Sequence, residues 1–243
     1  LSISIDKDAI VKEVLRGYGK VINTPYPFDE DVPSSIYDVE RAKKLLTESK
    51  ALKNSSSTIE ITLATANTDE LRKVAEMIKK DWEKIGVNAT LAIYELSDLN
   101  QSVIKDREFQ VLLFGSIIQS PSDLYAFWHS SQRSYPGLNI SNYVSKKLDT
   151  NLETLRESTD ELARISAYEL VKKEFEEETP GIFIFAPSLI YITNDKVKSE
   201  LPVYSFDSSS RFNLVNDWYQ YTEKVWPKTY YKQVLQTLQN IIH

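Results

Sequence analysis

Alternating hydrophobic and polar positions along residues 58–94 predict a strand, a helix and a second strand. Ile59, Ile61 and Leu63 occupy every second position of "TIEITLAT", which is the period of a strand with one buried face. In "DELRKVAEMIKKDWEKIGV" the apolar residues, Trp82 among them, recur every three or four positions, as in an amphipathic helix. "NATLAIYEL" alternates again. A strand, helix and strand of this length form a βαβ unit, so we expect a parallel sheet and a buried Trp82.

Further helix and strand patterns flank this unit. "DKDAIVKEVLR" and "YDVERAKKLLTES" each place an aspartate before an apolar helical stripe, so Asp6 and Asp38 are expected to cap two helices. Residues 145–157 and 160–178 also have helical patterns. "FQVLLFG" predicts a third strand, apolar enough to be central. The predicted fold class is α/β, with a mixed, mainly parallel sheet flanked by helices.

The composition excludes several kinds of partner and site. The chain has 243 residues, which suits one large domain or two small ones. Its net charge is −6 and it has no long run of lysine or arginine, so we expect neither nucleic acid nor an anionic membrane as a partner. Cysteine is absent, which excludes disulfides and thiol-metal sites. No segment approaches the roughly 20 apolar residues of a membrane span.

Residues that could support catalysis are sparse. The chain has no glycine-rich phosphate loop and no G-x-S-x-G motif. Neither His129 nor His243 belongs to a triad pattern, and ligands for zinc are lacking, so His129 is interpreted as a hydrogen-bonded structural residue. Glu174 and the run Glu176–Glu178 are interpreted as a solvated helix face rather than as paired catalytic acids. We expect no enzyme, no metal site and no cofactor.

The stretch "FGSIIQSPSDLYAFWHSSQ", residues 114–132, is the strongest candidate for a binding site. It follows the predicted third strand, and α/β sheets bind ligands at the ends of their strands. Its second half gathers Tyr125, Phe127 and Trp128 among polar residues. These aromatics could anchor the core, which is the preferred interpretation of Phe127 and Trp128, or line a mostly apolar pocket with a few polar groups.

Several segments together resemble one family, the family 5 extracellular solute-binding proteins, which are the peptide-, dipeptide- and nickel-binding receptors of ABC importers. In "SISIDKDAIVKEVLRGYGKVINTPYP", Ile5, Asp6 and Lys7 stand where the family has Ile-Asp-Arg. The segments that follow are similar to later family motifs, in the same order and with similar spacing. The resemblance runs from residue 1 to about residue 225, through "YDVERAKKLLTES", "DLYAFWHSSQRSYPGLNISNYVSKKLD", "ELARISAYELVKKEFEEETPGIFIFAP" and "NDWYQYTEKV".

The resemblance implies a periplasmic-binding-protein-like lobe of type II in residues 1–215. This lobe would close on its ligand with a second lobe that precedes Leu1, while residues 216–243 would return to the receptor's first domain and end in a helix. The implied function is that of the substrate-binding component of an ABC importer, without catalysis, which captures peptides or a related small solute. A non-transporting sensor or interaction module is the alternative, and a carboxylate-dependent hydrolase is less favoured.

The same resemblance implies partners and a location. The expected partners are the solute, the ABC permease subunits and the missing lobe of the same chain. The expected location is extracellular or periplasmic, with the membrane reached only through an anchor outside these residues, as in a lipoprotein.

The resemblance also implies a set of ligand-binding residues. In peptide-binding members an aspartate of the loop after this strand pairs with the free amine of the ligand. Gln119 stands at that position here and Asp123 is the nearest acid, so we expect a ligand without a free amine to bind about as well as one with it. Tyr191 falls where family members place a tyrosine in the site. The candidate ligand-binding residues are Gly115, Ser116, Gln119, Ser120, Asp123, Asn139, Tyr143 and Tyr191.

Overall fold

The chain forms two compact units, Leu1–Leu189 and Ile190–His243. The structure is a computed structural model, and it describes residues 1–26, 36–49, 59–198, 209–220 and 227–239. Each unit is described by itself below. The functional division expected between residues 215 and 216 stays a prediction.

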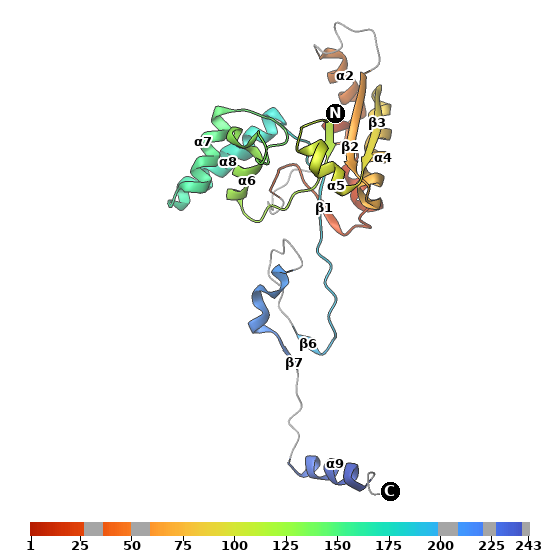
Figure 1. Cartoon of the computed structure of the whole chain (residues 1–243), viewed down its shortest axis with the longest axis vertical. Helices are drawn as coiled ribbons and strands as arrows, with labels where there is room; N and C mark the ends of the chain where they lie inside the picture. Colours follow the sequence, from red (N-terminus) through yellow and green to blue (C-terminus); the bar gives the residue numbers. More distant parts are fainter. Residues whose placement is uncertain (27–35, 50–58, 199–208, 221–226, 240–243) are drawn as a thin grey trace. The chain divides into compact units, whose positions relative to one another are not determined.

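The larger unit is built on a three-stranded parallel sheet, with the strand order β3–β2–β4 (Figure 1). The central strand β2 (Ile59–Ala66) pairs in parallel with β3 (Val87–Tyr94) along its whole length. Helix α4 (Asp69–Lys84) connects these two strands, and the Thr68 side chain accepts a hydrogen bond at its N-terminus. The predicted βαβ unit and its parallel strands are therefore confirmed.

Strand β4 (Val111–Leu113) is shorter than expected and has a different place in the sheet. It pairs with the last part of β2 and, within the described residues, with no other strand. The expectation that "FQVLLFG" forms a central strand was wrong. Its apolar character has another cause, because Leu113 packs into the core on one face of the sheet and Leu112 into the core on the other.

The principal core lies between the sheet and the helices on one of its faces. Trp82 on α4 is 2% exposed, as predicted. The Asp6 carboxylate accepts a hydrogen bond from the backbone N–H of Ala9, and Asp38 accepts one from Arg41, so both predicted caps are confirmed. The remaining elements around this core are α1 (Lys7–Glu13), α2 (Val39–Glu48) and the antiparallel pair of β1 (Gly19–Val21) with β5 (Phe185–Pro187).

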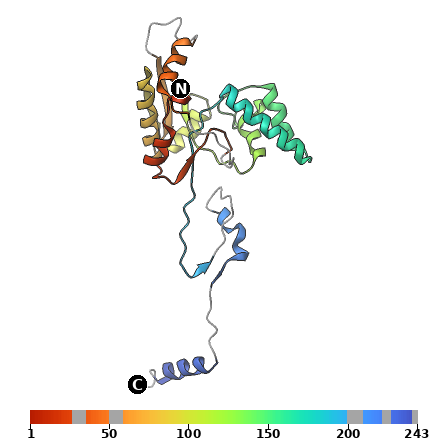
Figure 2. The same ribbon diagram turned by 180° about the vertical axis from the view of Figure 1, so that it is seen from behind.

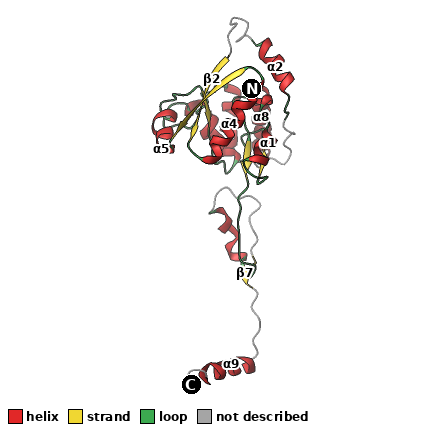
Figure 3. Ribbon diagram, turned by 90° about the vertical axis from the view of Figure 1, so that its right-hand side faces the viewer, coloured by secondary structure: helices red, strands yellow, loops and turns green. Residues whose placement is uncertain are grey.

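The opposite face of the sheet is covered by a short helical segment. It begins as α5 (Leu96–Asp98) and continues as the π-helical η2 (Leu99–Ile104) (Figure 3). Leu99 and Val103 from η2 are buried against small residues of β2. The segment Leu96–Ile104 is therefore helical in two consecutive parts.

A helical layer with its own core lies beside the sheet, as Figures 1 and 2 show from opposite sides. We call residues 114–181 the helical half and the rest of the larger unit the sheet half. Trp128 meets Phe175 edge-to-face, with ring centroids 4.7 Å apart, so its predicted role as a core anchor is confirmed. The elements of the helical half are η3 (Pro121–Asp123), α6 (Leu124–Trp128), η4 (Ser130–Gln132), α7 (Lys146–Glu157) and α8 (Glu161–Glu178).

The smaller unit contains short pieces of regular structure. Strands β6 (Val197–Lys198) and β7 (Tyr219–Gln220) pair antiparallel, and η5 (Ser210–Asp217) precedes β7. The last described element is helix α9 (Pro227–Gln239). In the described part of the chain, no helix combines the length and the apolar character that a bilayer crossing requires.

Candidate functional site

The loop of residues 114–120 leaves the end of β4 and is anchored before, within and after its length. Before the loop, the Leu113 carbonyl accepts a hydrogen bond of 3.1 Å from the Thr65 hydroxyl. Within it, Ile118 is only 7% exposed and packs into the core of the helical half. After it comes η3. Contacts within the protein therefore hold the two ends of the loop and Ile118.

The side chains between these anchors are exposed. Phe114 is 42% exposed and Ile117 is 60% exposed, although both are large and apolar, and Gln119 is exposed as well. Phe114 and Ile117 lie within the candidate stretch 114–132, but neither is among the candidate ligand-binding residues named from the sequence. The sequence did contain an indication of these exposed residues. Apolar residues continue from the strand into the loop, where no strand pairing accounts for their apolar character.

The Asp123 carboxylate fixes the end of the loop. Its Oδ2 accepts hydrogen bonds from the backbone N–H groups of Gln119, at 2.8 Å, and Ser120, at 3.0 Å. Ser120 and Asp123 form a capping box around η3, with Pro121 at the first helical position. The sequence "SPSD" thus encodes a helix start, and five candidate residues lie in this one loop and cap: Gly115, Ser116, Gln119, Ser120 and Asp123.

Asn139 lies in the loop between η4 and α7 and is fully buried. Its side-chain amide nitrogen lies 3.1 to 3.2 Å from the carbonyl oxygens of Trp128, His129 and Tyr143 and donates to them. One side chain therefore holds two backbone segments together, residues 128–129 and Tyr143. The structure gives Asn139 a supporting position, with no part of the side chain at the surface.

Tyr143 is connected to a buried carboxylate. Its hydroxyl donates to Glu174 Oε1 at 3.1 Å, Ser145 donates to the same oxygen at 2.6 Å, and Lys147 Nζ lies 2.8 Å from Oε2. Glu174 is only 6% exposed, so its interpretation as part of a solvated face was wrong. The cause is its position on α8 between the buried Val171 and Phe175.

These contacts shift the ionisation of both groups. Burial alone would raise the pKa of Glu174, but the hydrogen bonds from Lys147, Ser145 and Tyr143 outweigh it and hold the pKa below its ordinary value. Burial, followed by the Glu174 carboxylate, raises the pKa of Tyr143. The Tyr143 hydroxyl is therefore a protonated donor whose hydrogen is already used within the protein.

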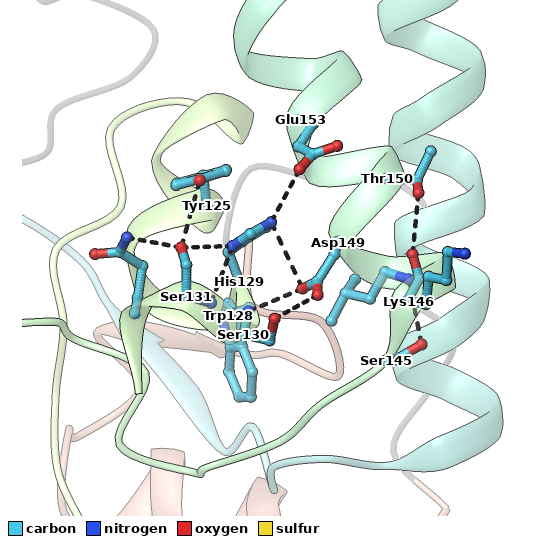
Figure 4. A network of polar contacts seen from close by, with 12 residues as sticks. Tyr125, Trp128, His129, Ser130, Ser131, Ser145, Lys146, Asp149, Thr150 and Glu153 are labelled. Atoms are coloured by element: carbon cyan, nitrogen blue, oxygen red, sulfur yellow. Dashed lines mark hydrogen bonds and ion pairs between the residues drawn. The ribbon is translucent and has the colours of Figure 1, made fainter. Parts of the chain in front are cut away.

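His129 lies at the centre of a polar network below α6 (Figure 4). The backbone N–H of Ser131 donates to Nδ1 at 3.1 Å, so the proton of the neutral ring lies on Nε2. Nε2 faces Glu153 Oε1 at 3.4 Å and Asp149 Oδ1 at 3.8 Å, and the Tyr125 ring stacks on the imidazole at 4.2 Å. With 7% exposure, His129 has the structural role that the sequence predicted.

Tyr191 belongs to the smaller unit. Its ring lies 6.0 Å from that of Trp218, and both residues line a hollow of about 530 Å³ with Thr193, Tyr219 and Gln220. Its expected role as a ligand-binding residue stays a prediction. Among the described residues, no group of three His, Cys, Asp or Glu side chains is placed to hold a metal ion.

Comparison with known families gives the class of protein to which this fold belongs, that of the solute-binding proteins. The model of the bacterial extracellular solute-binding proteins, family 5 middle region, matches residues 1–136. The chain belongs to this family.

Curated relatives have similar sequences over most of the chain. The dipeptide-binding protein of Escherichia coli is 27% identical over 224 residues, which cover 89% of this chain and 41% of that protein. The oligopeptide-binding protein AppA of Bacillus subtilis is 26% identical over 205 residues, 77% of this chain and 38% of AppA. The chain therefore spans about two fifths of the length of these relatives.

Solved structures have the same architecture. HbpA2 from Haemophilus parasuis superposes with a TM-score of 0.69 at 28% identity, over 82% of this chain and 40% of that one. AppA from Bacillus subtilis, solved with a nonapeptide, superposes with a TM-score of 0.68 at 22% identity, over 91% of this chain and 46% of that one. The predicted periplasmic-binding-protein-like fold is thereby confirmed.

Proposed function

We propose that the chain is the ligand-binding lobe of a receptor for an ABC importer, and that it captures a peptide or a related small solute against a second lobe. Family membership and the fold support the receptor function. The single observation that carries the site is loop 114–120, which is fixed at the end of a parallel strand and exposes Phe114 and Ile117. Exposed large apolar side chains on a fixed loop are typical of a surface that another molecule covers.

The candidate residues divide into two roles in this proposal. Gly115, Ser116 and Gln119 are exposed and contact the ligand together with Phe114 and Ile117. The second group supports this surface from behind, since its polar atoms are hydrogen-bonded within the protein. It comprises Ser120, Asp123, Asn139 and Tyr143. Tyr191 stays a candidate ligand-binding residue in this proposal.

The proposed receptor is longer than the chain. Relatives are more than twice as long, and their additional length would supply the second lobe, which precedes residue 1. Residues 1–215 form the lobe in this proposal, and residues 216–243 return to the first domain. The receptor acts outside the cytoplasmic membrane, held to it by an anchor outside these residues, and delivers its ligand to permease subunits without catalysis.

Titration calorimetry on the full-length receptor and on the isolated chain, with a peptide mixture as ligand, tests the proposal. A single lobe buries only part of a ligand, so the isolated chain should bind at least about 100-fold more weakly. In the full-length receptor, Ile117→Asp should weaken binding about tenfold or more, because the substitution places a charge where an apolar contact is expected.

Ile165→Asp is the matched control, because Ile165 on α8 is 55% exposed, close to the 60% of Ile117. This control should bind like the unmodified receptor. Equal binding by the isolated chain and the full-length protein, or an equal loss in the two variants, would contradict the proposal.

A further inference from the structure

Loop 114–120 has no charged side chain, and the one nearby acid is already occupied. Between Val111 and Trp128 the chain contains a single Asp, Glu, Lys or Arg residue, which is Asp123. Its Oδ2 accepts two backbone N–H groups of the loop, and the Ser120 hydroxyl approaches Oδ1 at 3.4 Å. A carboxylate in this position stabilises the polypeptide that it caps.

A cation also lies beside Asp123. Arg156 from α7 lines the same surface hollow as Asp123, and its guanidinium carbon lies 4.4 Å from the centre of the Tyr125 ring. An ammonium group entering this hollow would meet a carboxylate with three hydrogen bonds and a guanidinium of the same charge as its own. The hollow therefore attracts a ligand amine less strongly than a carboxylate without these hydrogen bonds and without Arg156 would.

We propose that loop 114–120 is a fixed, uncharged contact surface, which selects ligands whose contacting part is apolar and neutral, and that Asp123 is a positioning residue rather than a reader of ligand charge. The inference rests on the proposed function. In chemical terms, the ligand class is a peptide, or a peptide-like solute, that presents an aliphatic or aromatic group and a neutral amide to this loop. The Gln119 amide can both donate to and accept from such a group.

The energetics favour this class for a physical reason. Burying an ammonium without a counter-ion is strongly unfavourable, whereas an amide needs only one or two hydrogen bonds. Phe114 and Ile117 gain from contact with an apolar ligand group. Because Ile118 and Asp123 hold the backbone before the ligand arrives, little conformational entropy is lost at this loop on binding.

A competition experiment on the full-length receptor tests the selectivity. The probe is a synthetic tetrapeptide library in which every sequence is present in equal amounts with a free and with an acetylated N-terminus. Mass spectrometry of the retained peptides gives the ratio of the two forms. We expect acetylated peptides to be retained as well as free ones or better, with apolar residues enriched. A depletion of acetylated peptides by tenfold or more would overturn the proposal.

Two variants separate positioning from charge reading. Asp123→Asn replaces an acceptor by an amide and should weaken retention of both forms together, about tenfold, with their ratio unchanged. Gln119→Asp adds a free carboxylate to the exposed loop and should shift the ratio toward free amines by about tenfold or more. A loss of only the free form in Asp123→Asn would show that Asp123 reads the amine and would overturn the proposal.

The outcomes also separate this inference from the proposed function. If the unmodified receptor retains no peptide of either form, its proposed function as a peptide receptor fails and the inference fails with it. If it retains free peptides and rejects acetylated ones, the receptor function stands and only the inference fails. Thermal unfolding of each variant monitors folding, and if Asp123→Asn does not fold, Gln119→Asp and the unmodified receptor still decide the question.

Discussion

The two halves of the larger unit, the sheet half and the helical half, differ in the kinds of side chain that they bury. The core of the sheet half is mainly aliphatic, and Trp82 is the largest side chain within it. The helical half combines an aromatic cluster with buried polar residues, His129, Asn139 and Glu174, each of which has specific partners. Hydrophobic patterning accounts for most of the core of the sheet half, whereas specific side-chain contacts hold the buried polar residues of the helical half. The exposed loop 114–120 begins at the boundary between the two halves.

Two of the buried charged side chains, Glu174 and Lys7, illustrate this difference. Glu174 in the helical half receives two hydroxyl donors and an ammonium group. Lys7 in the sheet half is 5% exposed, and its Nζ donates at 2.7 Å to the neutral amide oxygen of Asn23. Burial lowers the pKa of Lys7 to about 8, and the nearby Asp8 opposes this only in part. The charge of Glu174 is therefore compensated by its partners, whereas that of Lys7 is only weakly compensated.

The largest expected effect comes from the core of the sheet half. Trp82→Ala should lower the free energy of unfolding by about 3–5 kcal/mol, since it removes a fully buried aromatic side chain. Leu162→Ala on α8 is the control, because Leu162 is 77% exposed, and its effect should stay within about 0.5 kcal/mol. Chemical denaturation of the 243-residue chain measures both. An unchanged denaturation midpoint for Trp82→Ala would contradict the burial of Trp82 in this core.

Much of the sheet half could be predicted from sequence because its signals are periodic. The alternation of Ile59, Ile61 and Leu63 gave the strand, and the stripe through Trp82 gave the helix face. The position of β4 could not be predicted in this way, because a strand covered on both faces is apolar at an edge as well as in the centre.

The buried polar residues of the helical half gave no comparable signal. Glu174 follows Lys172 and Lys173 and precedes further acids along α8, so its burial depends on Ser145 and Lys147, which are distant in the sequence. Asn139 in a polar loop looks like a surface residue until its three carbonyl partners are in place. The sequence correctly predicted that loop 114–120 follows a strand, but it could not show that the Asp123 carboxylate accepts hydrogen bonds from the backbone of this loop.

A smaller effect on stability is expected from Lys7→Met, which tests the comparison between the sheet half and the helical half. The substitution keeps the approximate volume and removes a buried charge, so the chain should gain about 1–2 kcal/mol of stability at pH 7. Between pH 8 and 10.5 the unfolded chain binds a proton at Lys7 that the folded chain has released, so the free energy of unfolding should rise with pH in this interval. That rise, at most about 3 kcal/mol, should be absent in the variant.

Lys147→Met is the matched control from the helical half. It removes the ammonium group that compensates the buried Glu174, so it should lower stability. Denaturation curves at pH 7, 8, 9 and 10 on the unmodified chain and both variants give the comparison. If both lysine variants change stability in the same direction, the proposed difference between the halves is wrong.

Hydrogen exchange on the full-length receptor, with and without bound peptide, tests the central claim most directly. Within the described residues, the backbone N–H groups of Gly115, Ser116 and Ile117 make no hydrogen bond, so a ligand that covers them should slow their exchange at least about tenfold. The amides of α7 and α8 should exchange at the same rates in both states, since the proposed function places no ligand contact on these helices. Protection confined to α7 and α8, or unchanged exchange at residues 115–117 in a receptor that binds peptide, would contradict the claim that this loop is the ligand-contacting surface of the lobe.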